Sequence, residues 1–340
     1  MRIARTTHRR VLYSGLALGV LLTGTVPVMT HGAGGHENDF VFRPLDVPGS
    51  TSTLPQGIND AGDISGVFTD SSGRHGFVLR RGEWMPTVVD YPGAAWTRVF
   101  GINAQGDVVG TYGPGDGSAS DVVGHGFLRS RHGQFTNIHY PGHLYEITQR
   151  ITSTGIILGC YHDTDFMGTM HGFIRFPWDG KEHHGNHNGL SEAEEDTGLS
   201  GLQRNEHRRH TRGSFTGFEL PNSMFTGATA DASIIVGIYG GLHSFVLEDG
   251  TFTPFDVPGS TLTWAYEINS QGHVVGHYRD SSGMFHGFLR DEDGEFTTLN
   301  FPGSNNTQAR SLNARGEVTG FYVKDGVNHG FIARPTREWW

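Results

Sequence analysis

Histidine recurs at one place in a repeated phrase, and six imidazoles in equivalent positions could bind metal. The phrase is HGF, once HSF, and its histidines are His75, His125, His171, His243, His286 and His329. A residue that recurs in every repeat most simply serves every repeat, for example by bonding a turn carboxylate such as Asp70 or Asp280. We therefore expect these histidines to be structural, and we predict no metal site and no cofactor.

The other motifs that could carry chemistry also favour structure. The chain has no G-x-S-x-G and no H-E-x-x-H motif. Its Asp-Ser-Ser-Gly segments resemble calcium loops, but they lack the late bidentate carboxylate of such a site and fit hairpin turns. Cys160 is the single cysteine, so no intramolecular disulfide can form, and we expect it to be a small core residue.

The elements around these histidines form a repeat. A second phrase, G-x-(I/V)-x-G, precedes each HGF, with Ser233 in place of the first glycine in the fourth copy. An aromatic residue follows its last glycine by two; the aromatic residues are Phe68, Tyr112, Tyr161, Tyr239, Tyr278 and Tyr322. Apolar residues alternate in short runs between Gly, Asp and Ser, which predicts four strands per copy, a to d. We expect the aromatic column to pack between neighbouring copies.

The strand count predicts how the copies are arranged. The sixth HGF is followed by no strand d, whereas a d-type strand, FRPLDVPG, stands ahead of the first copy. An open solenoid would need polar caps at both ends. We predict an all-β fold, a six-bladed β-propeller with four short strands per blade, closed by the N-terminal strand completing the last blade.

The phrases LDVPGS, GIN, GDVVG and HGF resemble the HAF-type repeats of bacterial extracellular proteins. The resemblance covers residues 42–334 apart from one insertion. It implies export and a repeat architecture. That family has no characterised activity, so the resemblance implies no active site.

The first 33 residues have the pattern of a secretory signal. Four arginines and no acid flank an apolar run that is too short for a membrane span. The chain without them has 21 basic and 35 acidic residues, a net charge of −14, which disfavours nucleic acid. We predict a secreted or periplasmic monomer without a membrane span, with the propeller at 40–334 and a C-terminal tail at 335–340.

Blade three contains a His-rich insertion at 178–213. It is polar, lacks aliphatic runs, and carries His183, His184, His187, His207 and His210. The composition predicts a disordered loop. Loose binding of zinc or copper through His-x-x-His spacing is the alternative.

Positions that differ between blades are free to specialise, and the most variable ones start strand a. We align the copies on Ile58-Asn59 of blade one, with Thr229-Ala230 in that place in blade four. The first variable column is Leu54, Arg98, Ile147, Phe225, Trp264 and Gln308. The second is Gln56, Phe100, Gln149, Gly227, Tyr266 and Arg310. Small residues between them put both columns on one side of the strand. The predicted site at this channel mouth comprises Trp96, Arg98, His143, Tyr145, Glu146, Trp264, Tyr266 and Arg310.

Aromatic rings with Arg and Glu around a concave mouth suit a carbohydrate or another small polar ligand. We therefore predict a secreted binding or scaffold protein. The alternative is a polysaccharide lyase or glycosidase. A glycosidase needs two carboxylates, and these columns offer Glu146 with Glu267 nearby, so we lean against an enzyme.

Overall fold

The computed structural model describes residues 39–114, 124–163, 169–177, 214–218 and 220–336. All of them belong to one unit, which spans residues 35–340. The predicted signal segment, the insertion at 178–213 and residues 337–340 of the predicted tail lie outside the described residues. The last strand ends at Pro335. Within the described part of the chain, no helix is long and apolar enough to cross a membrane.

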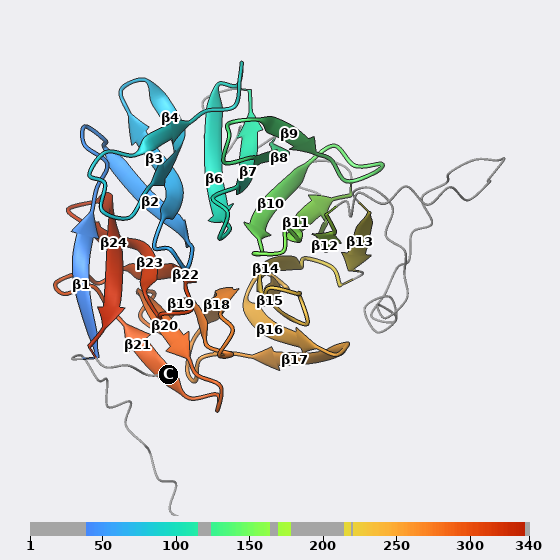
Figure 1. The fold of residues 1–340 in the computed structure, drawn as a ribbon. Helices are drawn as coiled ribbons and strands as arrows, with labels where there is room; N and C mark the ends of the chain where they lie inside the picture. Colours follow the sequence, from blue (N-terminus) through green and yellow to red (C-terminus); the bar gives the residue numbers. More distant parts are fainter. Residues whose placement is uncertain (1–38, 115–123, 164–168, 178–213, 219, 337–340) are drawn as a thin grey trace, which may run out of the picture. The chain divides into compact units, whose positions relative to one another are not determined.

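Alternating apolar residues between glycine turns form six four-stranded antiparallel sheets, which surround a common centre (Figure 1). From the inner to the outer strand, blades one to three are β2 (Ser52–Ile58), β3 (Ile64–Asp70), β4 (Gly73–Leu79), β5 (Thr87–Val89); β6 (Trp96–Ile102), β7 (Val108–Gly113), β8 (His125–Arg129), β9 (Phe135–Ile138); and β10 (Glu146–Ile151), β11 (Ile157–His162), β12 (Met170–Arg175), β13 (Phe215–Phe218). Blades four to six are β14 (Met224–Ala228), β15 (Ile234–Tyr239), β16 (His243–Glu248), β17 (Thr251–Phe255); β18 (Leu262–Ile268), β19 (Val274–Arg279), β20 (Phe285–Arg290), β21 (Phe296–Leu299); and β22 (Thr307–Leu312), β23 (Val318–Lys324), β24 (Val327–Pro335), β1 (Phe40–Leu45).

The ring closes as the strand count predicts. β1 pairs antiparallel with β24, with Phe42 opposite Ala333, and so supplies the outer strand of the last blade. Figure 1 shows the first and last strands side by side. The six-bladed propeller is thereby confirmed.

The repeated histidines bond the turns around them. His75 Nδ1 lies 2.8 Å from Asp90 Oδ2, and its Nε2 lies 3.5 Å from Asp70 Oδ1. In blade five, His286 Nε2 lies 3.0 Å from Asp280 Oδ2. The structural role predicted for these histidines is confirmed in both blades.

The repeated glycines and aromatic residues hold neighbouring blades together. A Cβ built on Gly76 of HGF would come within 2.5 Å of Val99 on the next inner strand, so a side chain there would push the blades apart. Tyr322 of the aromatic column stacks on Phe301 of the preceding blade, with ring centroids 3.6 Å apart. Tyr322 belongs to a core cluster with strands of blades five and six, which confirms the predicted packing between blades.

Blade four differs from the predicted alignment by one residue. Met224 pairs with Ile238 as Leu54 pairs with Val67, so Met224 takes the place that we gave to Phe225. The cause is a longer turn between the first two strands: Thr229 N donates to Ile234 O, five residues on, instead of four. The predicted register of blade four is therefore wrong.

Candidate ligand-binding site

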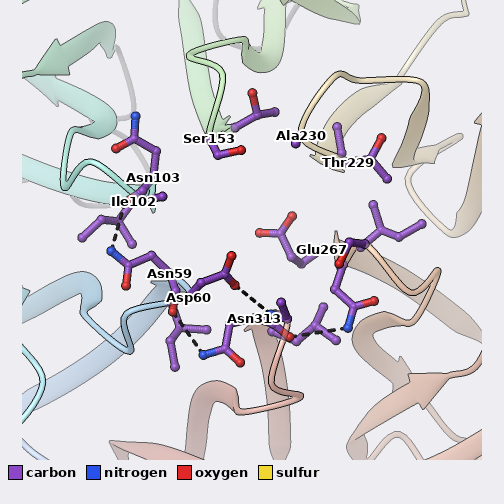
Figure 2. Close-up of a pocket in the computed structure, with 18 of the residues that line it drawn as sticks. Asn59, Asp60, Ile102, Asn103, Ser153, Thr229, Ala230, Glu267 and Asn313 are labelled. Atoms are coloured by element: carbon purple, nitrogen blue, oxygen red, sulfur yellow. Dashed lines mark hydrogen bonds between the residues drawn. The ribbon is translucent and has the colours of Figure 1, made fainter. Parts of the chain in front are cut away.

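One mouth of the central channel forms a cavity of about 140 Å³. It lies where the six inner strands end and turn into the second strand of each blade (Figure 2). We call it the turn-side pocket. Each blade contributes three consecutive positions: an aliphatic residue, then Asn or Thr, then a residue at the rim; blade five adds Glu267.

Asparagine at the second position shapes the turn. In blade one, Asn59 Oδ1 accepts a hydrogen bond from Asp63 N at 2.9 Å, and Asn59 O accepts one from Gly62 N at 2.9 Å. Gly62 has φ +85°, a conformation that favours glycine. The Asn-x-x-Gly pattern therefore fixes the turns of blades one, two, five and six at the edge of the pocket.

The asparagine amides also link neighbouring blades. Asn313 Nδ2 donates to Asn59 O at 3.1 Å, across the seam where the ring closes. Asn59 Nδ2 donates to Asn103 O at 3.0 Å, and Asn269 Nδ2 donates to Asn313 O at 3.4 Å. These bonds order part of the mouth, which favours a preformed site.

Small residues at the third position leave the mouth open. The rim residues are Asp60, Ala104, Ser153, Ala230, Ser270 and Ala314. Asp60 is the largest of them, and its Oδ1 accepts a hydrogen bond from Ala314 N at 2.8 Å. The rim therefore presents short polar and apolar groups, and none of the residues that line the pocket is basic.

A buried ion pair lies one residue deeper along the inner strands. Arg150 Nε is 2.7 Å from Glu267 Oε2, and the Arg150 side chain is 4% exposed. Its Nη1 donates to Gln56 O at 2.9 Å and to Phe100 O at 2.8 Å, and its Nη2 donates to Arg310 O. Burial raises the pKa of Glu267 to about 7, while Arg150 beside it opposes that rise. The pair closes the channel beneath the pocket.

The carbonyls that hold Arg150 come from irregular points in the inner strands. Each inner strand skips one residue in its pairing register, for example between Pro55 and Gly57. The skipped residues include Gln56, Phe100 and Arg310. Such bulges bend a strand and free backbone groups from the ladder. Here the freed carbonyls become ligands of one guanidinium.

None of the eight residues predicted from the variable columns lines the turn-side pocket. They lie at the starts or in the middle of the inner strands, or in the loops before them. Trp96 is 2% exposed, and its Nε1 donates to Pro114 O at 2.6 Å. The guanidinium carbon of Arg98 lies 4.9 Å from the centre of the Trp96 ring. The structure thus brings these two residues together.

Trp264, Tyr266 and Arg310 form a second group around the inner strand of blade five. The Arg310 guanidinium lies 4.2 Å from the centre of the Tyr266 ring, and Tyr266 is 4% exposed. Both Trp264 and Tyr266 contact the ring of His277, each at 5.5 Å between centroids. The side chains of Trp264 and Tyr266 therefore share one side of the strand, as predicted, but Tyr266 is an interior residue.

The remaining three predicted residues belong to one segment of blade three. His143 Nδ1 lies 2.9 Å from His162 O, and Tyr145 is half-buried. Glu146 is 1% exposed; its Oε1 accepts from Gly126 N at 3.2 Å, and its Oε2 lies 3.4 Å from His139 Nδ1. Burial raises the pKa of Glu146 to about 7. The role of all eight residues in ligand binding stays a prediction.

The residues that line the pocket were not predicted, except Glu267, which we had weighed as a second acid. The signal was present in the sequence, because the residue after each Asn or Thr is short in all six blades. Among the described residues, no group of three or more His, Cys, Asp and Glu side chains could hold a metal ion.

No family model matches the chain, and no curated protein matches it. Solved structures of similar fold include TolB from Acinetobacter baumannii (TM-score 0.48, 12% identity, 82% of this chain and 64% of that chain), Aleuria aurantia lectin in complex with Fucα1-6GlcNAc (0.43, 10%, 88% and 100%) and Trypanosoma rangeli sialidase (0.45, 11%, 88% and 58%). The chain thus spans less than two thirds of the TolB and sialidase chains. At these identities the likeness concerns the propeller fold alone.

Proposed function

We propose that this protein is an extracellular or periplasmic binding protein, which holds a small uncharged hydroxylated ligand, such as a sugar, in the turn-side pocket. The observation that carries the proposal is a pocket at one channel mouth, lined by amide, hydroxyl and backbone groups and closed beneath by Arg150 and Glu267. Concave sites with a few fixed polar groups are the usual form of small-molecule sites.

The charges of the pocket favour an uncharged ligand. Glu267 lines the pocket; it is already paired with Arg150 and accepts a hydrogen bond from Ser311 Oγ at 3.3 Å. Aliphatic side chains such as Ile58 and Ile102 alternate with the polar groups around the wall. Hydroxyl groups on a carbon frame match both kinds of surface.

The enzyme alternative has less support. Glu146 is the first residue of β10. Glu267 contacts Arg150, which lies on β10 four residues after Glu146. At about 3.3 Å per residue, roughly 13 Å of β10 lies between Glu146 and Arg150, the residue that holds the Glu267 carboxylate. The acid pairs of glycosidases lie about 5–9.5 Å apart. This pair therefore does not suit that reaction.

A ligand screen with two matched variants tests the proposal. The purified protein is screened on a glycan array and against free monosaccharides by saturation-transfer NMR, and hits are measured by calorimetry. Ala104→Trp fills the pocket from an exposed rim position, whereas Gln105→Trp adds the same bulk one residue outside the lining. We expect A104W to abolish binding and Q105W to retain it.

Binding that survives A104W would remove the pocket from consideration. An Arg98→Ala, Tyr145→Ala double variant would then test the opposite mouth, where the variable columns lie. A screen in which no hydroxylated compound binds would contradict the proposal as a whole.

A further inference from the structure

The backbone carbonyls around the turn-side pocket fall into two halves. In blades one, two and six, the carbonyls of Asn59, Asn103 and Asn313 each accept two hydrogen bonds. One comes from a glycine N–H of the same turn, at 2.9, 3.1 and 2.9 Å respectively. The other comes from the asparagine amide of the preceding blade, at 3.1, 3.0 and 3.4 Å. In this half of the ring, the two acceptor positions of each carbonyl are taken.

The other half, in blades three to five, lacks the second bond. The carbonyls of Thr152, Thr229 and Asn269 accept the turn N–H at 3.0, 2.9 and 3.1 Å, and no other described residue bonds to them. For Thr229 and Asn269 the cause lies in the sequence, because the preceding blades carry threonine, which has no amide to donate. The carbonyl of Thr152 follows Asn103, whose amide donates to Asp107 Oδ2 at 3.2 Å. The amides of Asn59 and Asn313 make a similar bond in their own turns and still reach the next blade, so this bond alone does not explain the difference.

The two threonine hydroxyls do not replace the missing amides. Thr152 Oγ1 lies 2.9 Å from Thr154 Oγ1 and accepts from Ile156 N, within its own turn. Thr229 Oγ1 donates to Asp231 Oδ1 at 3.0 Å, also within its turn. Both side chains thus point back into their own blades, and the neighbouring carbonyls keep one acceptor position each.

We propose that the carbonyl oxygens of Thr152, Thr229 and Asn269 form an acceptor edge, which recognises hydroxyl groups along one side of the ligand, and that Thr152 and Thr229 set this specificity. All three residues line the pocket, and they belong to three consecutive blades. Each of these carbonyls keeps one acceptor position beside its turn N–H bond, so a ligand that donates a hydrogen bond there gains selectivity over one that cannot. This inference rests on the proposed function.

The chemistry points to vicinal hydroxyls rather than to an amine. Neutral carbonyls in adjacent blades offer one acceptor position each, which suits several donors spread along an edge. Glu267 completes that side of the pocket, but its charge is balanced by Arg150. A cation would therefore find no uncompensated carboxylate on this side.

The acceptor edge is tested by replacing Thr152 and Thr229 with asparagine, the residue that the other four blades carry at this position. Thr152→Asn would offer an amide to Thr229 O, and Thr229→Asn would offer one to Asn269 O. With the monosaccharide that binds best in the screen as probe, we expect each single variant to bind several-fold more weakly and the double variant at least tenfold more weakly. Ala61→Asn is the matched control, since it adds the same amide at an exposed turn position of blade one, outside the pocket lining; it should bind within about threefold of the wild type. Melting curves establish that each variant is folded.

A second measurement uses monodeoxy analogues of the same sugar. We expect the wild type to lose affinity for those analogues that lack a hydroxyl on one edge, and the double variant to discriminate less between them. Normal binding by the folded Asn variants, together with loss of binding in A104W, would overturn the acceptor edge and leave the pocket in place. Normal binding by A104W would overturn both.

Discussion

Arg150 Nε and Glu267 Oε2 meet at 2.7 Å across the centre of the ring and join blade three to blade five. Through carbonyls, the same guanidinium also bonds blades one, two and six. No equivalent arginine stands in the other blades, where the position holds Gly57, Gly101, Gly227, Glu267 and Ser311. One side chain therefore ties five blades together at the point where they converge.

Removal of the arginine should destabilise the ring severely. Arg150→Met leaves Glu267 and three backbone carbonyls buried without their donor, and breaking a buried pair in this way costs about 3–5 kcal/mol. We expect a matching fall in the free energy of unfolding, measured by urea denaturation. Adding Glu267→Met should recover part of that loss, because the second change removes the uncompensated carboxylate. Equal stability of R150M and the wild type would show that the pair does not hold the blades.

The pH dependence of stability should carry the signature of Glu146. Its pKa in the folded protein is raised from 4.5 to about 7, so between those values the folded state binds a proton that the unfolded state releases. This contribution therefore favours folding at low pH and is lost as the pH rises through 7. Relative to Glu146→Thr, the wild type should lose about 1–3 kcal/mol between pH 5 and pH 8.

Blades one, two, five and six carry threonine at the position of Glu146. Threonine is therefore known to fit the backbone at this position of a blade. Urea denaturation at four pH values gives the comparison. Glu295→Thr, in an exposed turn, is the control and should follow the wild-type curve. Parallel curves for E146T and the wild type would contradict the raised pKa.

The stacked pair of Phe301 and Tyr322 should contribute measurably to the cohesion of blades five and six. Phe301→Ala removes a half-buried ring that lies 3.6 Å from Tyr322 and should cost about 2–4 kcal/mol. Val47 and Val257 stand at the equivalent place in other blades, so Phe301→Val should cost less than half as much. Thermal melting measures both variants, and equal losses for Ala and Val would exclude a role for the stacked ring.

Ring closure can be locked covalently. Arg43 and Ile332 lie opposite each other on β1 and β24, so cysteines at these two positions, in a Cys160→Ser background, should oxidise within one chain. Removing the freedom of so long a loop should stabilise the fold by about 2–4 kcal/mol. The misaligned pair Arg43→Cys, Gly330→Cys should not form the bond. Non-reducing gels and mass spectrometry distinguish the two pairs.

The repeats were sufficient to predict the fold. The sequence has an extra outer strand ahead of the first copy and lacks that strand after the last copy. A closed ring accounts for both if the first strand completes the last blade, and the pairing of β1 with β24 confirms this. The register of blade four was missed because its turn holds one residue more, with Ala232 at φ 57° where blade one has Gly62. A turn without the Asn-x-x-Gly pattern gives no local signal of its length.

The site was harder to predict, since alternation along a strand reveals which side a residue faces and not what covers that side. Trp96 and Tyr266 vary between blades as binding residues do, yet both are buried at seams. Variation there reflects different packing at each seam. The pocket is formed by turns whose short residues looked uninformative, because their effect is to leave space.

The pairing of β1 with β24 also dictates an order of assembly. Blades one to five can each form from adjoining segments, whereas the His329–Asp46 contact joins residues that are 283 positions apart. Bringing distant segments together costs chain entropy before the contact between them can stabilise the fold, so such contacts form more slowly. The last blade must therefore form late, and until then the outer edge of β24 is exposed. During that interval the edge can recruit the β1 strand of a second molecule, so refolding at high concentration should yield strand-exchanged dimers.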